Sequence, residues 1–191
     1  MRIILVVAAV AVGTAIAGVS VAAAAGPQQT VTATLISRPA HTLAPGSTVS
    51  ASKIFGHRVF NDAKHGFALV DTGQAQYPAA TSDGGKTWKT DGPALHLNAA
   101  QAPLAVIYIG IAGQKTIFAW GTGQVIDSTS DGGQHWYRAV FFGLPVAVIR
   151  NPQGHLVAFV DGETSGSNAT LQYVSKNGGR TWRLDNTIGG S

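Results

Sequence analysis

The sequence predicts an all-β protein built from about three four-stranded blades of the β-propeller type, and three observations support this class. Glycine is abundant, at 24 of 191 residues, while charged residues make up only 12%. Apolar residues reach 45%, which argues against disorder, and no long segment of helical period follows the N-terminal stretch. The third observation is an octapeptide that recurs three times at nearly even spacing.

The first element along the chain is a targeting segment over residues 1–25. Arg2 precedes an uncharged stretch from Ile3 to Ala25 that ends in four alanines. An early positive charge, an apolar run and small residues are typical of a secretory signal, and cleavage after Ala25 is the favoured interpretation. An uncleaved membrane anchor is the alternative, because the stretch is long enough to cross a bilayer as a helix. Both interpretations place the remaining chain outside the cytoplasm, secreted or held at the cell envelope.

Residues 26–53 form the second element, which we interpret as a linker. The segment consists largely of Thr, Ser, Pro, Ala and Gly, a composition typical of connecting segments. One strand-like patch covers residues 30–36, so a strand added to the edge of the folded domain is the alternative.

The third element, residues 54–191, contains the repeated octapeptide. Each copy has a hydroxyl residue, Asp or Asn two positions later, two glycines and a tryptophan, and the tryptophans stand 48 and then 46 residues apart. The members are Thr81, Asp83, Gly85 and Trp88; Thr129, Asp131, Gly133 and Trp136; and Ser175, Asn177, Gly179 and Trp182.

The chemistry of the octapeptide predicts a hairpin turn rather than a catalytic site. Asp or Asn accepts hydrogen bonds from nearby backbone amides, and the two glycines tolerate positive φ. Asn177 makes the same local bonds without charge, whereas a catalytic carboxylate or hard-metal ligand would lose its role in that exchange. We therefore expect the acidic residues to be turn acceptors and the three tryptophans to be core residues.

Three strand-like runs precede each turn and one follows it. Four strands in every 46 to 48 residues is the spacing of a propeller blade. The runs before the turns are 57–60, 66–70 and 77–81; 105–109, 116–120 and 125–129; and 146–149, 155–160 and 170–174.

The octapeptides resemble the Asp-box of BNR-repeat proteins, which include sialidases, sortilin-type receptors and the photosystem II assembly and stability factors. The phrase from Phe60 to Leu69 is most similar to the blade opening of the last group and its bacterial relatives. The resemblance covers residues 52–185 and implies a β-propeller fold. It also implies that the Asp-boxes lie away from the ligand face and have a structural role.

A non-catalytic module for protein binding or assembly is the function we expect, and no catalytic residue is predicted. The alternative is a sialidase-like protein that binds or hydrolyses glycans. Against hydrolysis, no spacing singles out two carboxylates outside the boxes, and residues 149–152 only partly match the Arg-Ile-Pro element of sialidases. The residues left open as surface contacts are Trp120, Asp161 and Glu163.

Composition restricts the partners and cofactors. The net charge of +4 comes from lysines and arginines scattered singly, whereas nucleic-acid binders cluster them. The chain has no cysteine, and its six histidines show no metal-ligand spacing, so no metal or cofactor is predicted. A membrane is a partner only if the N-terminal segment stays uncleaved.

Three blades are fewer than the four to eight that close a propeller. Two chains could join head to tail into a six-bladed ring, or the end blades could dock on another protein. A fragment of a once longer gene is the remaining explanation.

Overall fold

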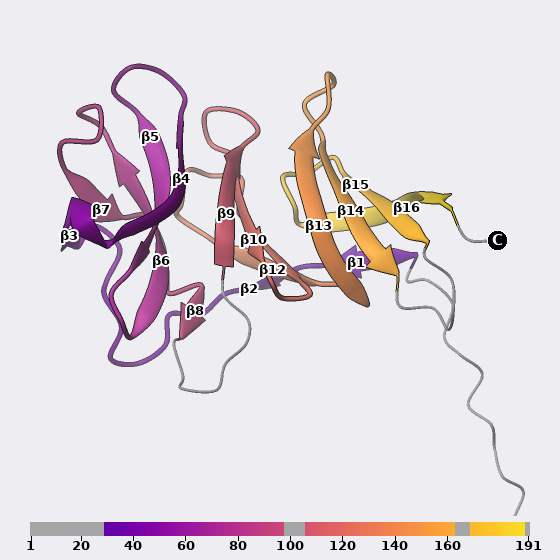
Figure 1. Cartoon of the computed structure of the whole chain (residues 1–191), viewed down its shortest axis with the longest axis horizontal. Helices are drawn as coiled ribbons and strands as arrows, with labels where there is room; N and C mark the ends of the chain where they lie inside the picture. Colours follow the sequence, from indigo (N-terminus) through magenta and orange to yellow (C-terminus); the bar gives the residue numbers. More distant parts are fainter. Residues whose placement is uncertain (1–28, 98–105, 163–168, 190–191) are drawn as a thin grey trace, which may run out of the picture.

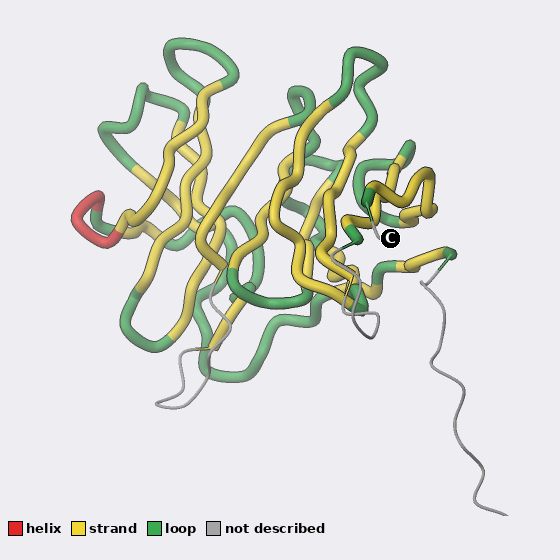
Figure 2. Tube along the Cα trace, turned by 45° about the vertical axis from the view of Figure 1, so that its right-hand side comes forward, coloured by secondary structure: helices red, strands yellow, loops and turns green. Residues whose placement is uncertain are grey.

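The computed structural model describes residues 29–97, 106–162 and 169–189, so the predicted leader lies outside the described residues. The described chain is all-β, as predicted. Three antiparallel sheets stand side by side without closing into a ring (Figures 1 and 2). The only helical element described is a 3-10 turn, η1 (Ala51–Lys53).

Each sheet contains a four-stranded meander in which the first strand is innermost and the fourth is outermost. The nine strand-like runs before the turns lie on these strands to within one residue over the described residues, which exclude Ala105, and the fourth strand follows each turn. The first blade has β4 (Ile54–Phe60), β5 (Gly66–Asp71), β6 (Ala75–Thr81) and β7 (Trp88–Thr90), with the short β8 (His96–Leu97) pairing β6. The second has β9 (Val106–Ile111), β10 (Ile117–Gly121), β11 (Val125–Thr129) and β12 (Tyr137–Val140). The third has β13 (Gly143–Arg150), β14 (Leu156–Gly162), β15 (Thr170–Ser175) and β16 (Thr181–Ile188).

The meanders give the molecule two ends. Loops 61–65, 112–116 and 151–155 lie at the same end as the three octapeptide turns, which we call the upper end, as drawn in Figure 1. Backbone bonds join the two kinds of loop there: Gly84 N donates to Lys64 O, and Gly132 N donates to Lys115 O. Loops 72–74, 122–124 and 141–142 lie at the opposite, lower end.

The linker expected over residues 26–53 is wrong for its described part. Residues 29–49, here called the strap, run along the outer edges of all three sheets and add a fifth strand to each. β1 (Thr30–Thr32) pairs β16, β2 (Thr34–Leu35) pairs β12, and β3 (Thr48–Val49) pairs β7. The outermost strand of a meander has a free row of backbone donors and acceptors, which two or three extended residues are enough to satisfy.

The core lies between neighbouring sheets, and the tryptophans of the second and third octapeptides each face the blade before them. Trp136 packs with Phe67 and Leu69 of the first blade, and Trp182 packs in the cluster that holds Phe118 of the second. Trp88 has no preceding blade among the described residues and packs instead with Val49 and Ile54. All three indoles are at most 1% exposed. Burying each apolar side chain of this size contributes about 2–3 kcal/mol before entropy is counted.

Candidate binding surface

The octapeptide turns are closed by their own side chains. Thr81 Oγ1 accepts from Gly85 N at 2.9 Å and donates to Asp83 Oδ1 at 2.8 Å. The Asp83 carboxylate accepts from the Thr87 hydroxyl at 2.6 Å and from the Thr87 amide at 2.9 Å. These two bonds from Thr87 hold the pKa of Asp83 far below its usual range. Every acceptor site used here points into the turn, which leaves the carboxylate little capacity for chemistry on a ligand.

The other two turns repeat this pattern, with one of these bonding residues substituted in the second turn and two in the third. Thr129 donates to Asp131 Oδ1 at 2.8 Å, and His135 replaces threonine, its Nδ1 lying 2.7 Å from Asp131 Oδ2. Burial alone would raise the pKa of Asp131, but the hydrogen bonds from His135 and Thr129 lower it to about 2. In the third turn Asn177 Oδ1 accepts from Ser175 Oγ at 3.0 Å and from Thr181 N at 2.9 Å.

A partly buried carboxyl lies at the boundary between the first and second blades. The carbonyl oxygen of Asp91 accepts the indole N–H of Trp136 at 2.8 Å, which ties the end of the first blade to the second. The side-chain Oδ2 of Asp91 is buried without a hydrogen-bond partner, against the turn at Gly133. Burial, followed by the charge of Asp131, raises the pKa of Asp91 to about 7.

A second ionisable group is fully buried inside the second blade. Arg138 on β12 donates from Nε and Nη2 to the two carboxylate oxygens of Asp127 on β11, at 2.7 and 2.6 Å. Arg138 also donates to the backbone oxygen of Leu95, which belongs to the first blade. Burial raises the pKa of Asp127, and the bonds from Arg138 oppose that rise. This pair is therefore part of the structure between the blades and is closed to solvent at Asp127.

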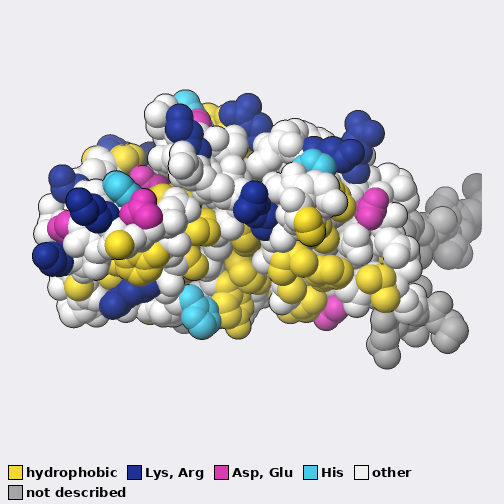
Figure 3. All heavy atoms as spheres, turned by 90° about the horizontal axis from the view of Figure 1, so that it is seen from above, with side chains coloured by type: hydrophobic (Ala, Val, Ile, Leu, Met, Phe, Trp, Pro, Cys, Tyr) yellow, Lys and Arg dark blue, Asp and Glu magenta, His cyan; other side chains and the backbone are white. Residues whose placement is uncertain are grey.

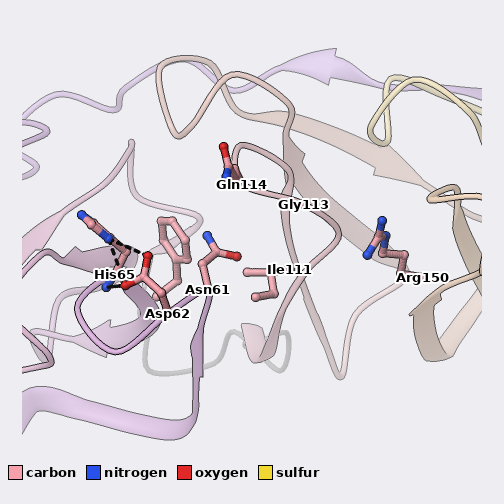
Figure 4. Close-up of a pocket in the computed structure, with 8 residues that line it drawn as sticks. Asn61, Asp62, His65, Ile111, Gly113, Gln114 and Arg150 are labelled. Carbon is pink, nitrogen blue, oxygen red and sulfur yellow. Dashed lines mark hydrogen bonds and ion pairs between the residues drawn. The ribbon is translucent and has the colours of Figure 1, made fainter.

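A cavity of about 670 Å³, lined by both polar and apolar residues, opens at the upper end among the three blades (Figure 4). Asp62 is already engaged there, because the amides of His65 and Lys64 lower its pKa to about 2. The side chains of Asn61, Gln114 and Arg150 make no hydrogen bond or ion pair with other described residues, so they remain open to a ligand. Figure 4 shows Arg150 on the opposite side of the cavity from Asn61 and Asp62.

Exposed hydrophobic side chains lie along the inner strands. Figure 3 shows them in patches along one long side, which is the side of β4, β9 and β13 that faces the viewer in Figure 1. Phe142, in the loop between β12 and β13, is 65% exposed, Val146 on β13 is 47% exposed and Tyr108 on β9 is 41% exposed. We call these three residues the lower inner surface, since Phe142 belongs to the lower end and the other two lie on inner strands.

The structure places the three open surface candidates differently. Trp120 is partly buried behind Tyr108, with the two ring centroids 5.1 Å apart, and it packs on the core between the second and third blades. Asp161 is exposed at the end of β14. Glu163 lies outside the described residues. The structure therefore presents the ring of Tyr108, rather than that of Trp120, to solvent.

Sequence reasoning did not find the lower inner surface. Tyr108 and Val146 each stand inside apolar strand runs whose neighbours are buried or half-buried, so no pattern of residue types distinguishes them. Val146 lies where the β13–β14 register shifts between Pro145 and Ala147, which leaves it without a partner on β14. A register shift of this kind is a property of strand pairing and is not written in composition.

Metal and membrane sites were also considered. Within residues 29–97, 106–162 and 169–189 no group of three His, Asp or Glu side chains could hold a metal ion. Over the same ranges, no helix has the length and apolar character needed to span a membrane.

Comparisons with known proteins give a partial likeness. No family model matches the chain. No curated protein matches it. A solved structure titled "YCF48 bound to D1 peptide" is similar over 81% of this chain, with 20% sequence identity and a TM-score of 0.49. The chain covers 49% of that protein, about half its length.

Proposed function

We propose that this protein is an exported, non-catalytic Asp-box propeller module that binds another protein through its lower inner surface. The observation that carries the proposal is the exposure of Tyr108 on β9, Val146 on β13 and Phe142 immediately before β13, on the inner strands of a rigid β scaffold. Exposed aromatic and aliphatic anchors of this kind typify protein-binding patches, in which a few such residues supply most of the binding energy.

The position of the Asp-box turns supports the same surface. The resemblance to BNR-repeat proteins implies that the ligand face lies opposite the Asp-boxes. In this chain the opposite end is the lower one, where Phe142 is the most exposed of the large hydrophobic residues described. The acidic residues of the first two boxes are engaged within their turns, which favours a binding role over a catalytic one.

Site-specific photo-crosslinking tests this proposal. A photoreactive amino acid replaces Phe142 in one form of the exported protein and Lys86, an exposed residue of the first octapeptide turn, in a control form. We expect a discrete crosslinked protein from position 142, suppressed by Val146→Asp in the same chain, and none from position 86. Equal crosslinking at both positions, or crosslinking from position 142 that Val146→Asp leaves unchanged, would refute the proposal that the lower inner surface binds the partner.

A glycan is the second candidate ligand, favoured by one observation. The rings of Tyr108 on β9 and His57 on β4 stack with centroids 6.3 Å apart and an interplanar angle of 21°, which forms a small aromatic platform on the inner strands. Sugars bind such platforms through their apolar faces. A glycan array separates the two candidates. Glycan binding that Tyr108→Ala abolishes would identify a glycan, in place of a protein, as the ligand. Release of product from a fluorogenic sialoside would indicate hydrolysis.

Export is the remaining part of the proposal and is supported by the predicted leader alone. Mass spectrometry of the protein recovered from culture medium tests it. We expect a chain that begins at Gly26, whereas a full-length chain in the membrane fraction would identify residues 3–25 as an anchor.

A further inference from the structure

We propose that the outward face of the third blade is an interface between two copies of this chain. β15 alternates between half-buried and buried residues along its whole length, a pattern that indicates a sheet covered on one face only. Its buried residues, such as Leu171 and Tyr173, face the second blade. The open side, here called the third-blade end face, carries Leu144, Ile149, Phe159, Val174 and Ile188.

The opposite end of the half-ring is closed by the chain itself. β5 of the first blade is buried on both faces, and on its outward side Val70 and Trp88 pack with Val49 and Ile54, between which the chain passes from β3 at the outer edge to β4 at the inner edge. The amide of Leu43 donates to the Tyr77 hydroxyl at 3.1 Å, which fixes the covering segment in place. A head-to-tail ring would require this end to be open. The third-blade end face is therefore left to pair with an identical face, as in a two-fold symmetric dimer.

The third-blade end face is complementary to itself. Ile149, Val157, Val174 and Arg183 form one row across β13 to β16, and Leu144, Asp161, Thr170 and Ile188 form a lower row. A hollow of about 410 Å³ lies at the far end of the upper row, and its lining includes the apolar Val174 and Leu184 and the charged Lys176, Arg183 and Asp185. A two-fold axis parallel to the strands lays β13 of one copy over β16 of the other. It thereby brings the 48%-exposed Ile149 onto this hollow.

The size of the face indicates a reversible dimer. Four strands about 4.8 Å apart and seven residues long, at about 3.3 Å per residue, cover roughly 400 Å² on each copy. The dimer would bury roughly 800 Å² in total, at the low end of specific interfaces. Arg183 and Asp185 supply a polar rim beside the apolar centre, as in other interfaces.

Sedimentation velocity on the purified exported protein, over a wide range of concentrations, tests the interface. We expect a monomer–dimer equilibrium, and Ile149→Lys should raise the dimer dissociation constant by about tenfold or more, because an ammonium group would be buried opposite Lys176 and Arg183 of the hollow. Leu97→Lys is the matched control, since Leu97 on β8 is 49% exposed and lies on the first blade. It should leave the dissociation constant unchanged.

Cysteine crosslinking tests the geometry, because the chain has no cysteine of its own. A mixture of the Leu144→Cys and Ile188→Cys variants should give a heterodimer with a short bis-maleimide, while either variant alone should not. Monomers at every concentration would overturn the proposal, and so would a dimer that Ile149→Lys leaves intact or that fails to crosslink positions 144 and 188. Full partner crosslinking from position 142 in Ile149→Lys would show that the two surfaces are independent.

Discussion

At the scale of single residues, the octapeptide turns show why their most distinctive residues are structural. Asp83, Asp131 and Asn177 each accept from the backbone amide four positions later, and the oxygen that does so is common to carboxylate and amide. What differs is the second oxygen, which pairs with Thr87 or His135 in the first two turns. The charge therefore strengthens the turn without being required for it.

Asp131→Asn tests this conclusion. Asn keeps an oxygen for the Thr129 hydroxyl and the His135 amide and loses one charge-assisted bond, so we expect a loss of about 0.5–1.5 kcal/mol in the free energy of unfolding. Asp131→Ala removes all of these bonds and should cost about 1–3 kcal/mol. Urea denaturation of both variants measures the difference. A loss for the Asn variant as large as for Ala would mean that the charge itself holds the turn.

The second glycine of each turn gives a graded prediction. Gly85, Gly133 and Gly179 have φ between 86° and 92°, so alanine costs about 1 kcal/mol at each position through backbone strain alone. A β-carbon at Gly85 would meet its nearest neighbour, the Trp88 ring, at 3.4 Å. At Gly133 it would collide with the Asp91 carboxyl, and at Gly179 with the Ser128 hydroxyl.

We therefore expect Gly133→Ala and Gly179→Ala to cost about 1–3 kcal/mol more than Gly85→Ala, since overpacking adds to strain. Thermal and urea midpoints of the three variants rank them. Equal losses of stability in the three variants would show that backbone strain alone sets the loss. The residues of the preceding blade would then move aside without a further cost in free energy. The turn residues and their buried tryptophans follow from the sequence, but this ranking depends on which residue of the preceding blade covers each turn.

At the scale of elements, the meanders could be predicted, whereas the strap was foreseen only in part, as the alternative of an edge strand over residues 30–36. The runs that became β5, β10 and β14 are five or more residues long, apolar and bounded by glycine or polar turns, which is enough to identify strands. β1, β2 and β3 have only two or three residues each, too few for alternation to appear. Val31 is nevertheless 2% exposed, because it inserts into the core beside Trp182. Its burial is decided by the free edge of β16, far away in sequence.

The contact between the first and second blades gives a prediction about pH. The pKa of Asp91 rises from 3.8 to about 7, first through burial and then through the charge of Asp131. A raised carboxyl pKa means that the folded state binds the proton more tightly than the unfolded state. The free energy of unfolding should then fall as pH rises from about 4 to about 7, by a few kcal/mol at most.

Asp91→Asn should remove this dependence. We expect the variant to be more stable than the parent at about pH 8 and no more stable at about pH 4, because the parent carboxyl is neutral at the lower pH. Asp161→Asn, at an exposed position, is the control and should show no such window. The lowered pKa values of Asp62 and Asp131, about 2 each, put their titration below this range. If the free energy of unfolding changed with pH in the same way for the parent and for Asp91→Asn, the carboxyl of Asp91 would not be the source of this dependence.

At the scale of the whole molecule, the strap connects the blades in the reverse of their chain order. It meets the third blade at β1, the second at β2 and the first at β3, while the meanders run from first to third (Figure 1). Blades in an ordinary array contact only their neighbours, so each can open separately. Here one segment pairs with all three outer strands, and opening the third blade must release Val31 from the core shared with the second. We therefore expect the half-ring to unfold as one cooperative unit.

Cutting the strap tests this coupling. A protease site inserted after Ala40, in an exposed stretch between β2 and β3, leaves β3 joined to the first blade and frees β1 and β2 as a separate peptide. After cleavage the peptide can dissociate, so the melting temperature should fall and become dependent on the concentration of added peptide. The uncut insertion variant should melt like the parent. A buried Val31 stabilises the fold by about 1.5 kcal/mol or more only while the strap is bound. Loss of the peptide with no change in the melting temperature would therefore mean that the strap follows the sheet edges without stabilising them.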